Sequence, residues 1–405
     1  MKKRKIISKS KSKPYKEEAI RISSRVQKER KSRKKEKRKV SIKVGDQNIN
    51  IKVIGIGGAG GNILTRMREK KIEGVEFVAL NTDVQALRLT KADVKIQLGK
   101  NACRGLGAGM DPDKGREAAQ ESLEEIDKIL SNTDLAFLAC GLGGGTGSGG
   151  APVVANLLRQ KNILTVAFVT RPFTFEGEKR QEVAEEAWQR LYSEVDSIIT
   201  ISNDRVFNVI KEQTPILDAF SKIDDIFRMG IKGIADLIFY PGLINLDYAN
   251  IKTILTNAGV TIMGMGSATG ENRARKAAQL AISSPLFDVS IDGAKKILFN
   301  ISGGKDLSLV EIHDASRMIT QTASKDAQVV FGTSFDKDLK KSEVKVTVIA
   351  GLSDQEFKEV YQPSPSLPTK VLIEDITEEK SEEESPKVDK EIEIPAFLRR
   401  QKKKK

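Results

Sequence analysis

Short apolar runs alternate with amphipathic stretches through the first half of the chain. The runs have the length and the Val, Ile and Leu content of buried strands; they are Ile51–Ile56, Val75–Leu80, Val94–Leu98, Leu135–Ala139, Leu164–Val169 and Ile198–Ile201. Stretches with helical spacing lie between several of them, such as Gly115–Leu130 and Gln181–Val195. Alternating strands and helices are typical of βαβ units. The pattern predicts a doubly wound, mostly parallel α/β sheet, in which ligands bind outside the carboxyl ends of the strands.

A long helix is predicted to follow. Thr214 is a favourable N-cap, and Pro215 fits the first helical position. Apolar residues then recur at spacings of three or four, as on one helical face, at Ile216, Phe220, Ile223, Phe227, Ile231, Ile234 and Ile238. Pro241–Gly242 should end it. Such a helix spans on the order of 35–40 Å, long enough to join two domains.

The second half has a different pattern. Strand-like runs are Val260–Met265, Lys296–Ile301, Gln328–Phe331 and Val344–Ile349, and helix-like stretches are Ala274–Ile282 and Leu309–Thr322. This pattern predicts a smaller α/β domain. We therefore expect a first domain over residues 48–213, a connecting helix over 214–240 and the smaller domain over 241–352.

The two ends of the chain differ from this body in charge. Residues 1–50 hold 20 Lys and Arg against 5 Asp and Glu, a net charge of +15, although the whole chain carries only +13. Residues 351–394 carry a net charge of −8, and the final segment then holds six bases. Such compositions cannot bury enough apolar surface to fold alone. We predict a disordered basic arm over 1–47, a disordered acidic linker over 353–391 and a terminal peptide over 392–405.

Composition excludes several classes of protein. Two cysteines among 405 residues rule out a disulfide framework, and Cys103 and Cys140 lack zinc-ligand spacing. A single histidine, His313, rules out a histidine-based metal cluster. No apolar run approaches the roughly 18 residues of a membrane span, and no apolar segment follows the basic start as in a secretory signal. We expect a protein of the reducing cytoplasm without a metal site built from its own side chains.

Glycine-rich loops carry the strongest chemical signal. They lie at Gly55–Asn62 after the first predicted strand, at Gly141–Gly149 after the fourth, and at Gly105–Gly109 between them. Glycines let the backbone approach a phosphate closely, and a following helix N-terminus supplies N–H donors. One such loop would fit a dinucleotide or a tight turn, whereas three in one sheet favour a polyphosphate. The chain has no Gly-x-x-x-x-Gly-Lys-Ser/Thr motif, so backbone dipoles rather than a lysine would bind the anion.

The segment Gly143–Gly149 matches the tubulin signature, and the body as a whole resembles the FtsZ family of bacterial cell-division GTPases. Other matching stretches are Ala79–Asp83, Arg171–Gly177 and Phe331–Thr333. The resemblance covers about residues 48–352 and the terminal peptide. It implies a GTP-binding α/β domain joined by a long central helix to a smaller α/β domain. It also implies GTP or GDP as the ligand, with Mg²⁺ accompanying the nucleotide.

The resemblance assigns a role to each loop. The residues that match the family's phosphate contacts are Gly58, Ala59, Gly60, Gly61, Asn62, Gly145, Thr146 and Gly147. Gly107, Ala108 and Gly109 would close over the γ-phosphate. Glu176 and Arg180 match contacts to the ribose and nucleotide, although from the residues alone they could be a surface ion pair of little energetic value.

Phe220 and Asp224 lie four residues apart on the predicted long helix and therefore share one face. The family uses these positions to stack on guanine and to recognise it. A carboxylate can accept hydrogen bonds from guanine N1–H and the amino group, a donor pair that adenine lacks, so Asp224 would select GTP. Without the resemblance, the helical stripe favours Phe220 as a core residue and Asp224 as a solvated one.

The segment Asn245–Asn250 resembles the family's catalytic loop, which inserts into the nucleotide site of the next subunit. Phosphoryl transfer depends mostly on positioning and electrostatics, so part of a site can come from a neighbour. The family usually has two aspartates, at the positions of Asp247 and Asn250 in this chain. An asparagine can orient water but cannot accept a proton, and losing such a group typically costs about 10²- to 10⁴-fold. Hydrolysis is therefore either slow or supported by Asp247 alone.

A second departure from the family is Met110–Asp111, where Ala-Asn is usual beside the γ-phosphate. A carboxylate at this position would repel the phosphate or demand Mg²⁺. It could equally point outward.

The terminal segment Glu393–Gln401 is similar to the family's peptide that docks on membrane-tethering partners such as the actin-like FtsA. The residues expected to contact the partner are Ile394, Pro395, Phe397, Leu398 and Arg399. The basic arm is unusual for the family. It could bind anionic lipid or nucleic acid, pair with the acidic linker, act as a transit peptide or remain a solvated tail.

The leading interpretation is an FtsZ-like GTPase that assembles head to tail into the filaments of a cytoplasmic, mid-cell division ring and hydrolyses GTP between subunits. The alternative is a GTP-binding scaffold filament with strongly impaired hydrolysis, because Asn250 replaces the second aspartate. A third class, a dinucleotide-dependent oxidoreductase, is suggested by the first glycine loop alone and disfavoured by the other two.

Overall fold

The computed structural model describes residues 49–69, 72, 74–208, 210, 213–239, 244, 246–283, 291–336, 339–340 and 342–352. The basic arm, the acidic linker and the terminal peptide lie outside the described residues, so what the sequence predicts for them stays a prediction.

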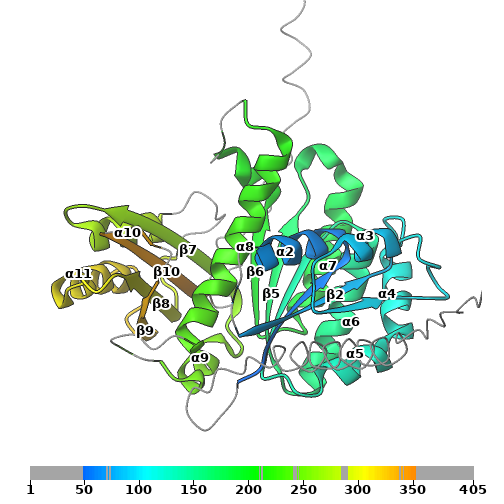
Figure 1. The fold of residues 1–405 in the computed structure, drawn as a ribbon, viewed down its shortest axis with the longest axis horizontal. Coiled ribbons are helices and arrows are strands. Elements are labelled where there is room, and N and C mark those ends of the chain that lie inside the picture. Colours follow the sequence, from blue (N-terminus) through cyan, green and yellow to red (C-terminus); the bar gives the residue numbers. More distant parts are fainter. Residues whose placement is uncertain are drawn as a thin grey trace, which may run out of the picture. The chain divides into compact units, whose positions relative to one another are not determined.

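A ten-stranded sheet runs through the described residues (Figure 1). From one edge to the other its strands are β3 (Val94–Gln97), β2 (Val75–Asn81), β1 (Ile51–Ile56), β4 (Leu135–Gly141), β5 (Leu164–Arg171), β6 (Ser197–Ser202), β7 (Gly259–Thr269), β10 (Glu343–Leu352), β8 (Lys296–Gly303) and β9 (Gln328–Phe335). The first six are parallel, in the doubly wound order 3-2-1-4-5-6, which confirms the predicted fold class. The winding direction reverses between β1 and β4, and such a switch point is where open α/β sheets bind ligands.

The strands of the second half continue this sheet. β6 and β7 are parallel neighbours through the pairs Ser197–Gly259 and Ile198–Val260. Beyond them β10 is antiparallel to both of its neighbours, β7 and β8, and β9 is parallel to β8. The sequence predicted these four strands as a separate smaller region. The pairing of β6 with β7 joins strands that are distant in sequence, so the pattern of apolar residues within each strand does not predict it.

Helices cover both faces of the sheet (Figure 1). They are α2 (Gly57–Glu69), α3 (Val84–Leu89), α4 (Pro112–Glu121), α5 (Leu123–Leu130), α6 (Gly145–Gln160), α7 (Glu178–Tyr192), α8 (Ile216–Phe239), α9 (Tyr248–Leu255), α10 (Arg273–Ile282) and α11 (Leu309–Thr320), with the short 3-10 helices η1 (Thr174–Glu176) and η2 (Asn203–Asn208). No helix of the described residues has the length and apolar character needed to cross a membrane.

Two helices differ from the sequence prediction. The stretch 115–130 was predicted as one helix, but it is divided into α4 and α5 at Ser122. The Ser122 hydroxyl accepts a hydrogen bond from the N–H of Gly99 (3.1 Å) in a neighbouring loop, which favours a break there. The long helix α8 begins at Ile216 rather than at Pro215, because the carbonyl of Pro215 already accepts the first helical hydrogen bonds.

Alternate residues of the central strands pack into two cores. In β4, Phe137 and Ala139 pack in the same core as residues of α2, α8 and α9, whereas Leu138 and Cys140 pack with residues of α6 and α7. A strand that is buried on both faces reads as a continuous apolar run. For this reason the apolar runs of the first half predicted the strands well.

The long helix α8 packs against both halves of the sheet. Its buried apolar residues share a core with residues of β5, β7, β8 and β10; the members from α8 are Ile223, Phe227, Ile231, Ile234 and Ile238. Those from the second half include Met263, Leu298 and Ile349. At about 1.5 Å per residue, α8 spans about 36 Å. A third core lies where α10 and α11 pack on the other face of β7, β8 and β10.

Candidate nucleotide-binding site

Two glycine loops meet at the carboxyl ends of β1 and β4, the strands that flank the switch point. The first opens α2 and the other opens α6. A Cβ added to Gly57 would lie 3.3 Å from the backbone nitrogen of Gly147, so the two loops touch. A Cβ added to Gly60 would lie 2.5 Å from the carbonyl oxygen of Ala139, so only glycine allows α2 to approach β4 this closely.

The first turns of α2 and α6 suit an anion. Neither contains an acidic residue, and the N-cap of α6, Gly144, provides no side chain to bind the first N–H groups. Gly58, Ala59 and Asn62 are exposed. Helix N-termini with accessible N–H donors attract phosphates through hydrogen bonds and the helix dipole. The predicted phosphate residues therefore lie together, with backbone donors available.

The third loop joins the other two. Its left-handed residues are Arg104, Gly105, Gly107, Gly109 and Met110, with φ from 51° to 86°. The N–H of Gly107 donates to the carbonyl of Thr82 (3.3 Å), and the Thr82 hydroxyl lies 2.6 Å from that of Thr146 on α6. A Cβ added to Gly145 would lie 2.8 Å from Cβ of Ala108. The three predicted loops therefore form one surface.

Asp111 has a structural role. It is the N-cap of α4, and its Oδ1 accepts hydrogen bonds from the N–H groups of Asp113 (2.9 Å) and Lys114 (3.2 Å). Ser, Thr, Asp and Asn are the residues that cap helices best. Oδ1 of Asp111 is therefore bound to the first turn of α4, a role that was not predicted from the sequence.

Glu176 and Arg180 form an ion pair beside the signature loop. Glu176 ends η1, and its Oε1 also accepts a hydrogen bond from the N–H of Phe173 (2.9 Å). A Cβ added to Gly143 would lie 3.0 Å from the carbonyl oxygen of Arg180, so the first turn of α7 abuts the loop. Both side chains are partly exposed, which leaves them accessible to a ligand.

Phe220 is not the core residue that its helical stripe suggested. Its side chain is 40% exposed, and its ring packs edge-on against Phe173, with 5.6 Å between centroids. Phe173 also contacts the exposed rings of Phe175 and Phe207. Sequence reasoning did not assign these neighbours a role, although two phenylalanines within a matching family stretch were a signal. Exposed aromatic rings offer stacking surfaces for a planar base.

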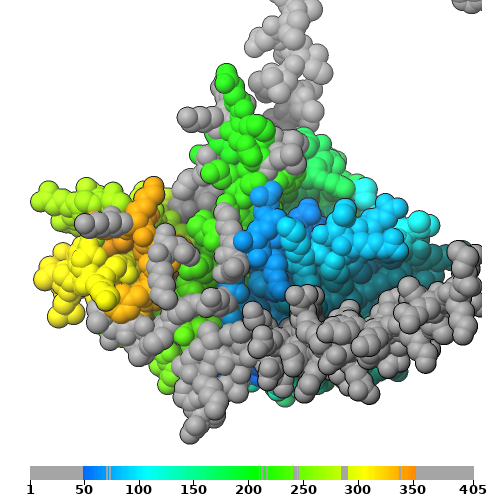
Figure 2. Space-filling view, viewed as in Figure 1, coloured from blue at the N-terminus to red at the C-terminus, as the bar shows by residue number. Residues whose placement is uncertain are grey.

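Asp224 is not a solvated helix position. Its side chain is only 13% exposed, and its Oδ2 lies 2.6 Å from Nε of Arg66 on α2. α2 lies beside α8 (Figure 2). Burial raises the pKa of Asp224 to about 6, although Arg66 opposes the shift. The contact of Arg66 with Asp224 was not predicted from the sequence. The one sequence feature that pointed to it was a basic residue one helical turn after Asn62, a predicted phosphate contact.

The predicted catalytic residues lie near the amino ends of the central strands, on the side of the sheet opposite to the glycine loops. Asp247 is the exposed N-cap of α9, and its Oδ1 accepts a hydrogen bond from the N–H of Asn250 (2.8 Å). The next residue, Tyr248, donates from its hydroxyl to the carbonyl of Asp134 (2.7 Å), directly before β4. The glycine loop follows the other end of β4. Seven residues at about 3.3 Å each separate these edges by about 20 Å, so Asp247 does not reach the nucleotide loops of its own chain.

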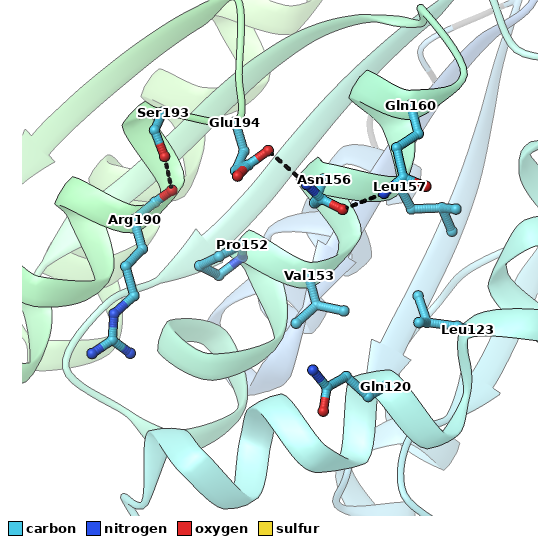
Figure 3. Close-up of a pocket in the computed structure, with 10 residues that line it drawn as sticks. All are labelled: Gln120, Leu123, Pro152, Val153, Asn156, Leu157, Gln160, Arg190, Ser193 and Glu194. Atoms are coloured by element: carbon cyan, nitrogen blue, oxygen red, sulfur yellow. Dashed lines mark hydrogen bonds between the residues drawn. The ribbon is translucent and has the colours of Figure 1, made fainter.

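A cavity of about 410 Å³ lies elsewhere, between α4, α5, α6 and α7 (Figure 3). Its lining residues are Gln120, Leu123, Pro152, Val153, Asn156, Leu157, Gln160, Arg190, Ser193 and Glu194. The amide of Asn156 is bound on both sides, by Glu194 (3.0 Å) and Gln160 (2.7 Å). None of the predicted site residues line this cavity. Within the part of the chain that the structure describes, no cluster of His, Cys, Asp and Glu could hold a metal ion.

Comparison with known proteins places these features in a family. Residues 50–211 match the GTPase domain of the Tubulin/FtsZ family, and residues 259–353 match the C-terminal domain of the FtsZ family. The chain is similar to an empty FtsZ dimer from M. jannaschii, with 39% identity and a TM-score of 0.73 over 78% of this chain and 93% of that one. A point-mutant FtsZ from M. jannaschii gives 40% identity and a TM-score of 0.72 over 76% and 92%.

A GTPγS-bound protofilament of CetZ2 from Haloferax volcanii shares the fold at 21% identity, with a TM-score of 0.66 over 77% of this chain and 96% of that one. The FtsZ matches are much closer in sequence. The chain therefore belongs to the FtsZ family: it is an FtsZ-like, GTP-binding GTPase that forms cell-division protofilaments.

Proposed function

We propose that this chain hydrolyses GTP only where two subunits meet head to tail. The observation that carries the proposal is the position of Asp247, at the edge of the sheet opposite to the glycine loops. A subunit with its nucleotide loops on one edge and its catalytic carboxylate on the other is incomplete alone. Stacking subunits edge to edge would bring the two together, in a heterologous contact that does not close on itself.

The chemistry at this contact follows from the groups present. Backbone N–H groups of α2 and α6 would hold the phosphates, and the loop 107–109 would close over the γ-phosphate. The neighbour's Asp247 has one oxygen committed to its own helix cap, which leaves Oδ2 to orient the attacking water. Mg²⁺ would be held by phosphate oxygens and water, because the first turns of α2 and α6 provide no carboxylate.

The base and ribose would lie toward α8 and α7. Phe220 offers a half-exposed ring for stacking on the base, and Asp224 offers a carboxylate to the two N–H donors of guanine. Glu176 and Arg180 are close to the signature loop and accessible to the ribose.

A second candidate function is a scaffold filament that binds GTP and barely hydrolyses it. The observation that favours it is Asn250, which is exposed on the first turn of α9 and brings no charge to the neighbour's site. Restoring the carboxylate with Asn250→Asp separates the two candidates. A gain in turnover supports the scaffold, and unchanged turnover means that Asp247 suffices.

The partner of the terminal peptide follows from the family alone. We expect the residues 394–399 to dock on a membrane-tethering division protein such as FtsA, which would hold the filament in a cytoplasmic ring at mid-cell. The basic arm is unusual for the family, and its positive charge would suit anionic lipid, nucleic acid or the acidic linker of the same chain. These segments lie outside the described residues.

The test of the proposed function is GTP turnover per subunit as a function of protein concentration, with Mg²⁺ present. We expect turnover to rise sharply above the concentration at which filaments appear by light scattering. Asp247→Asn should abolish most turnover while it leaves GTP binding intact, because the substitution is at the far edge of the sheet. A rate per subunit that does not depend on concentration would overturn the proposal.

A further inference from the structure

The segment that presents Asp247 is fastened at both of its ends. Upstream, the N–H of Ile244 donates to the hydroxyl of Thr333 on β9 (2.9 Å), and the N–H of Thr333 donates to the carbonyl of Ile244 (3.0 Å). Downstream, the hydroxyl of Tyr248 donates to the carbonyl of Asp134 (2.7 Å). Asp247 is exposed between these two attachments, and its Oδ1 caps α9 through the N–H of Asn250 (2.8 Å).

Asp134 is a firm attachment point. Its N–H donates to the carbonyl of Asn50 (3.0 Å), and its carboxylate accepts the N–H of Asn50 (2.8 Å). Its carbonyl also accepts the N–H of Leu164 (3.3 Å). These bonds join the amino ends of β1, β4 and β5. A group that is hydrogen-bonded to Asp134 is therefore fixed relative to the sheet that carries the glycine loops.

We infer that Tyr248 is a positioning residue, whose hydroxyl fixes the direction in which Asp247 points at the nucleotide of the next subunit. The inference rests on the proposed function. Tyr248 directly follows Asp247, so a shift of the tyrosine backbone moves the carboxylate that must reach the neighbour's water. A catalytic group misplaced by about 1 Å can lose much of its effect.

The hydroxyl is suited to this task. The ring of Tyr248 packs at the border of the main core, and burial raises the pKa of the hydroxyl to about 12. The group therefore stays protonated, and remains a donor to Asp134, across the physiological pH range.

Removal of the hydroxyl should leave the fold intact. Ile251, Ile254 and Leu255 of α9 are buried, and the carbonyl of Leu255 accepts a hydrogen bond from Ser197 (2.8 Å). After loss of the tyrosine hydroxyl, the carbonyl of Asp134 keeps its bond from Leu164, so no buried acceptor is left unpaired. Tyr248→Phe is thus a change in positioning rather than in stability.

The experiment compares Tyr248→Phe with the full-length wild type in GTP turnover, nucleotide affinity and critical concentration for assembly. We expect turnover per assembled subunit to fall about three- to tenfold, the range for one lost hydrogen bond. Affinity and critical concentration should stay within about twofold, since neither measures the direction of Asp247. The matched control is Thr253→Ala, which removes a hydroxyl that bonds only within α9 and should leave all three quantities unchanged.

The second arm of the experiment places both variants in an Asp247→Asn background, where an amide oxygen can still cap α9. If Tyr248 acts through Asp247, Tyr248→Phe should have no further effect there, whereas independent effects would add. An equal loss in both backgrounds, or wild-type turnover in Tyr248→Phe, overturns the inference and leaves the proposed function standing. Wild-type turnover in Asp247→Asn alone overturns the proposed function, and the inference with it.

Discussion

At the scale of single residues, the proposed contact of Asp224 with guanine predicts how nucleotide binding responds to pH. Only its ionised form can accept both N–H donors of guanine, and its pKa is raised to about 6 because the side chain is buried. We expect GTP affinity to be constant above this pH and to fall by up to about tenfold per pH unit below it. Titration with a fluorescent GTP analogue between about pH 5 and 7.5 measures the effect. Asp224→Asn should bind more weakly, with a flat profile; a wild-type profile as flat as that of the variant would contradict the assignment.

Unfolding does not explain such a loss. A carboxyl whose pKa is higher in the folded chain than in the unfolded chain binds its proton more tightly when folded. Asp224 therefore destabilises the fold above about pH 6, and this cost disappears as the pH falls toward the usual range of a carboxylic acid. GTP affinity therefore falls in the same pH range, below about 6, in which protonation of Asp224 makes the fold more stable.

Two glycines in the first loop differ in what surrounds them. A Cβ on Gly60 would lie 2.5 Å from the carbonyl of Ala139, whereas a Cβ on Gly58 would meet nothing within 4 Å. We expect Gly60→Ala to destabilise the protein by about 1–3 kcal/mol or more, as overpacking does. Gly58→Ala, the matched control, should be neutral or slightly stabilising because alanine favours the helix. Thermal unfolding without nucleotide measures both, and equal melting temperatures would contradict the close approach of α2 to β4.

At the scale of elements, an ion cluster joins α10 to α11. Arg273 at the start of α10 lies 2.6 Å from Asp306 and 2.7 Å from Glu311 in the first turn of α11. The bond to Arg273 holds the pKa of Glu311 at about 2, well below its usual value. A lowered carboxyl pKa stabilises the fold above the pKa of the unfolded chain, and this stability is lost as the pH falls toward the folded value.

Arg273→Met should therefore lower the free energy of unfolding at pH 7 by about 1–3 kcal/mol, since it takes the buried guanidinium away from Glu311, whose carboxylate is only 25% exposed. The difference from the wild type should shrink as the pH falls from about 4.5 toward 2. Urea unfolding at several pH values measures it. Lys179→Met, which removes only the exposed pair with Glu182, is the control and should change stability by less than about 0.5 kcal/mol.

The elements also show what the sequence could predict. The sequence predicts strand β4, which is buried on both faces, from its continuous apolar run. It predicts α8 from its apolar stripe. In both cases the apolar pattern of the element itself is sufficient. The break at Ser122 was not predicted, because its cause is a bond to Gly99, distant in sequence. The glycine loops were recognised from spacing, but the contact of Arg66 with Asp224 depends on how α2 packs against α8. Both of these misses depend on a partner that is distant in sequence.

At the scale of the whole molecule, the sheet fixes the position of the glycine loops relative to Asp247. The glycine loops follow its parallel strands, and α9 is attached before β4 through Tyr248 and beside β6 through Ser197. α8 packs against both halves of the sheet, and it begins near Phe220 and Asp224, the residues proposed to bind the base. A filament built by repeating this unit would place one complete site at each contact, and would leave an incomplete nucleotide site at one end and an unused Asp247 at the other.

This arrangement predicts complementation between two inactive variants. Asp247→Asn keeps its nucleotide site but cannot complete that of its neighbour, whereas Asp224→Ala loses its own site but keeps Asp247. Each should show little turnover alone. An equal mixture should recover roughly a quarter of wild-type turnover, because a productive contact needs an intact site from one variant and Asp247 from the other. Phosphate release at a fixed total concentration measures this, with light scattering to verify that the mixture assembles. If a mixture that forms filaments stays as inactive as its components, the two groups act within one chain, and the separation of about 20 Å along β4 would have to be bridged by a rearrangement of α9.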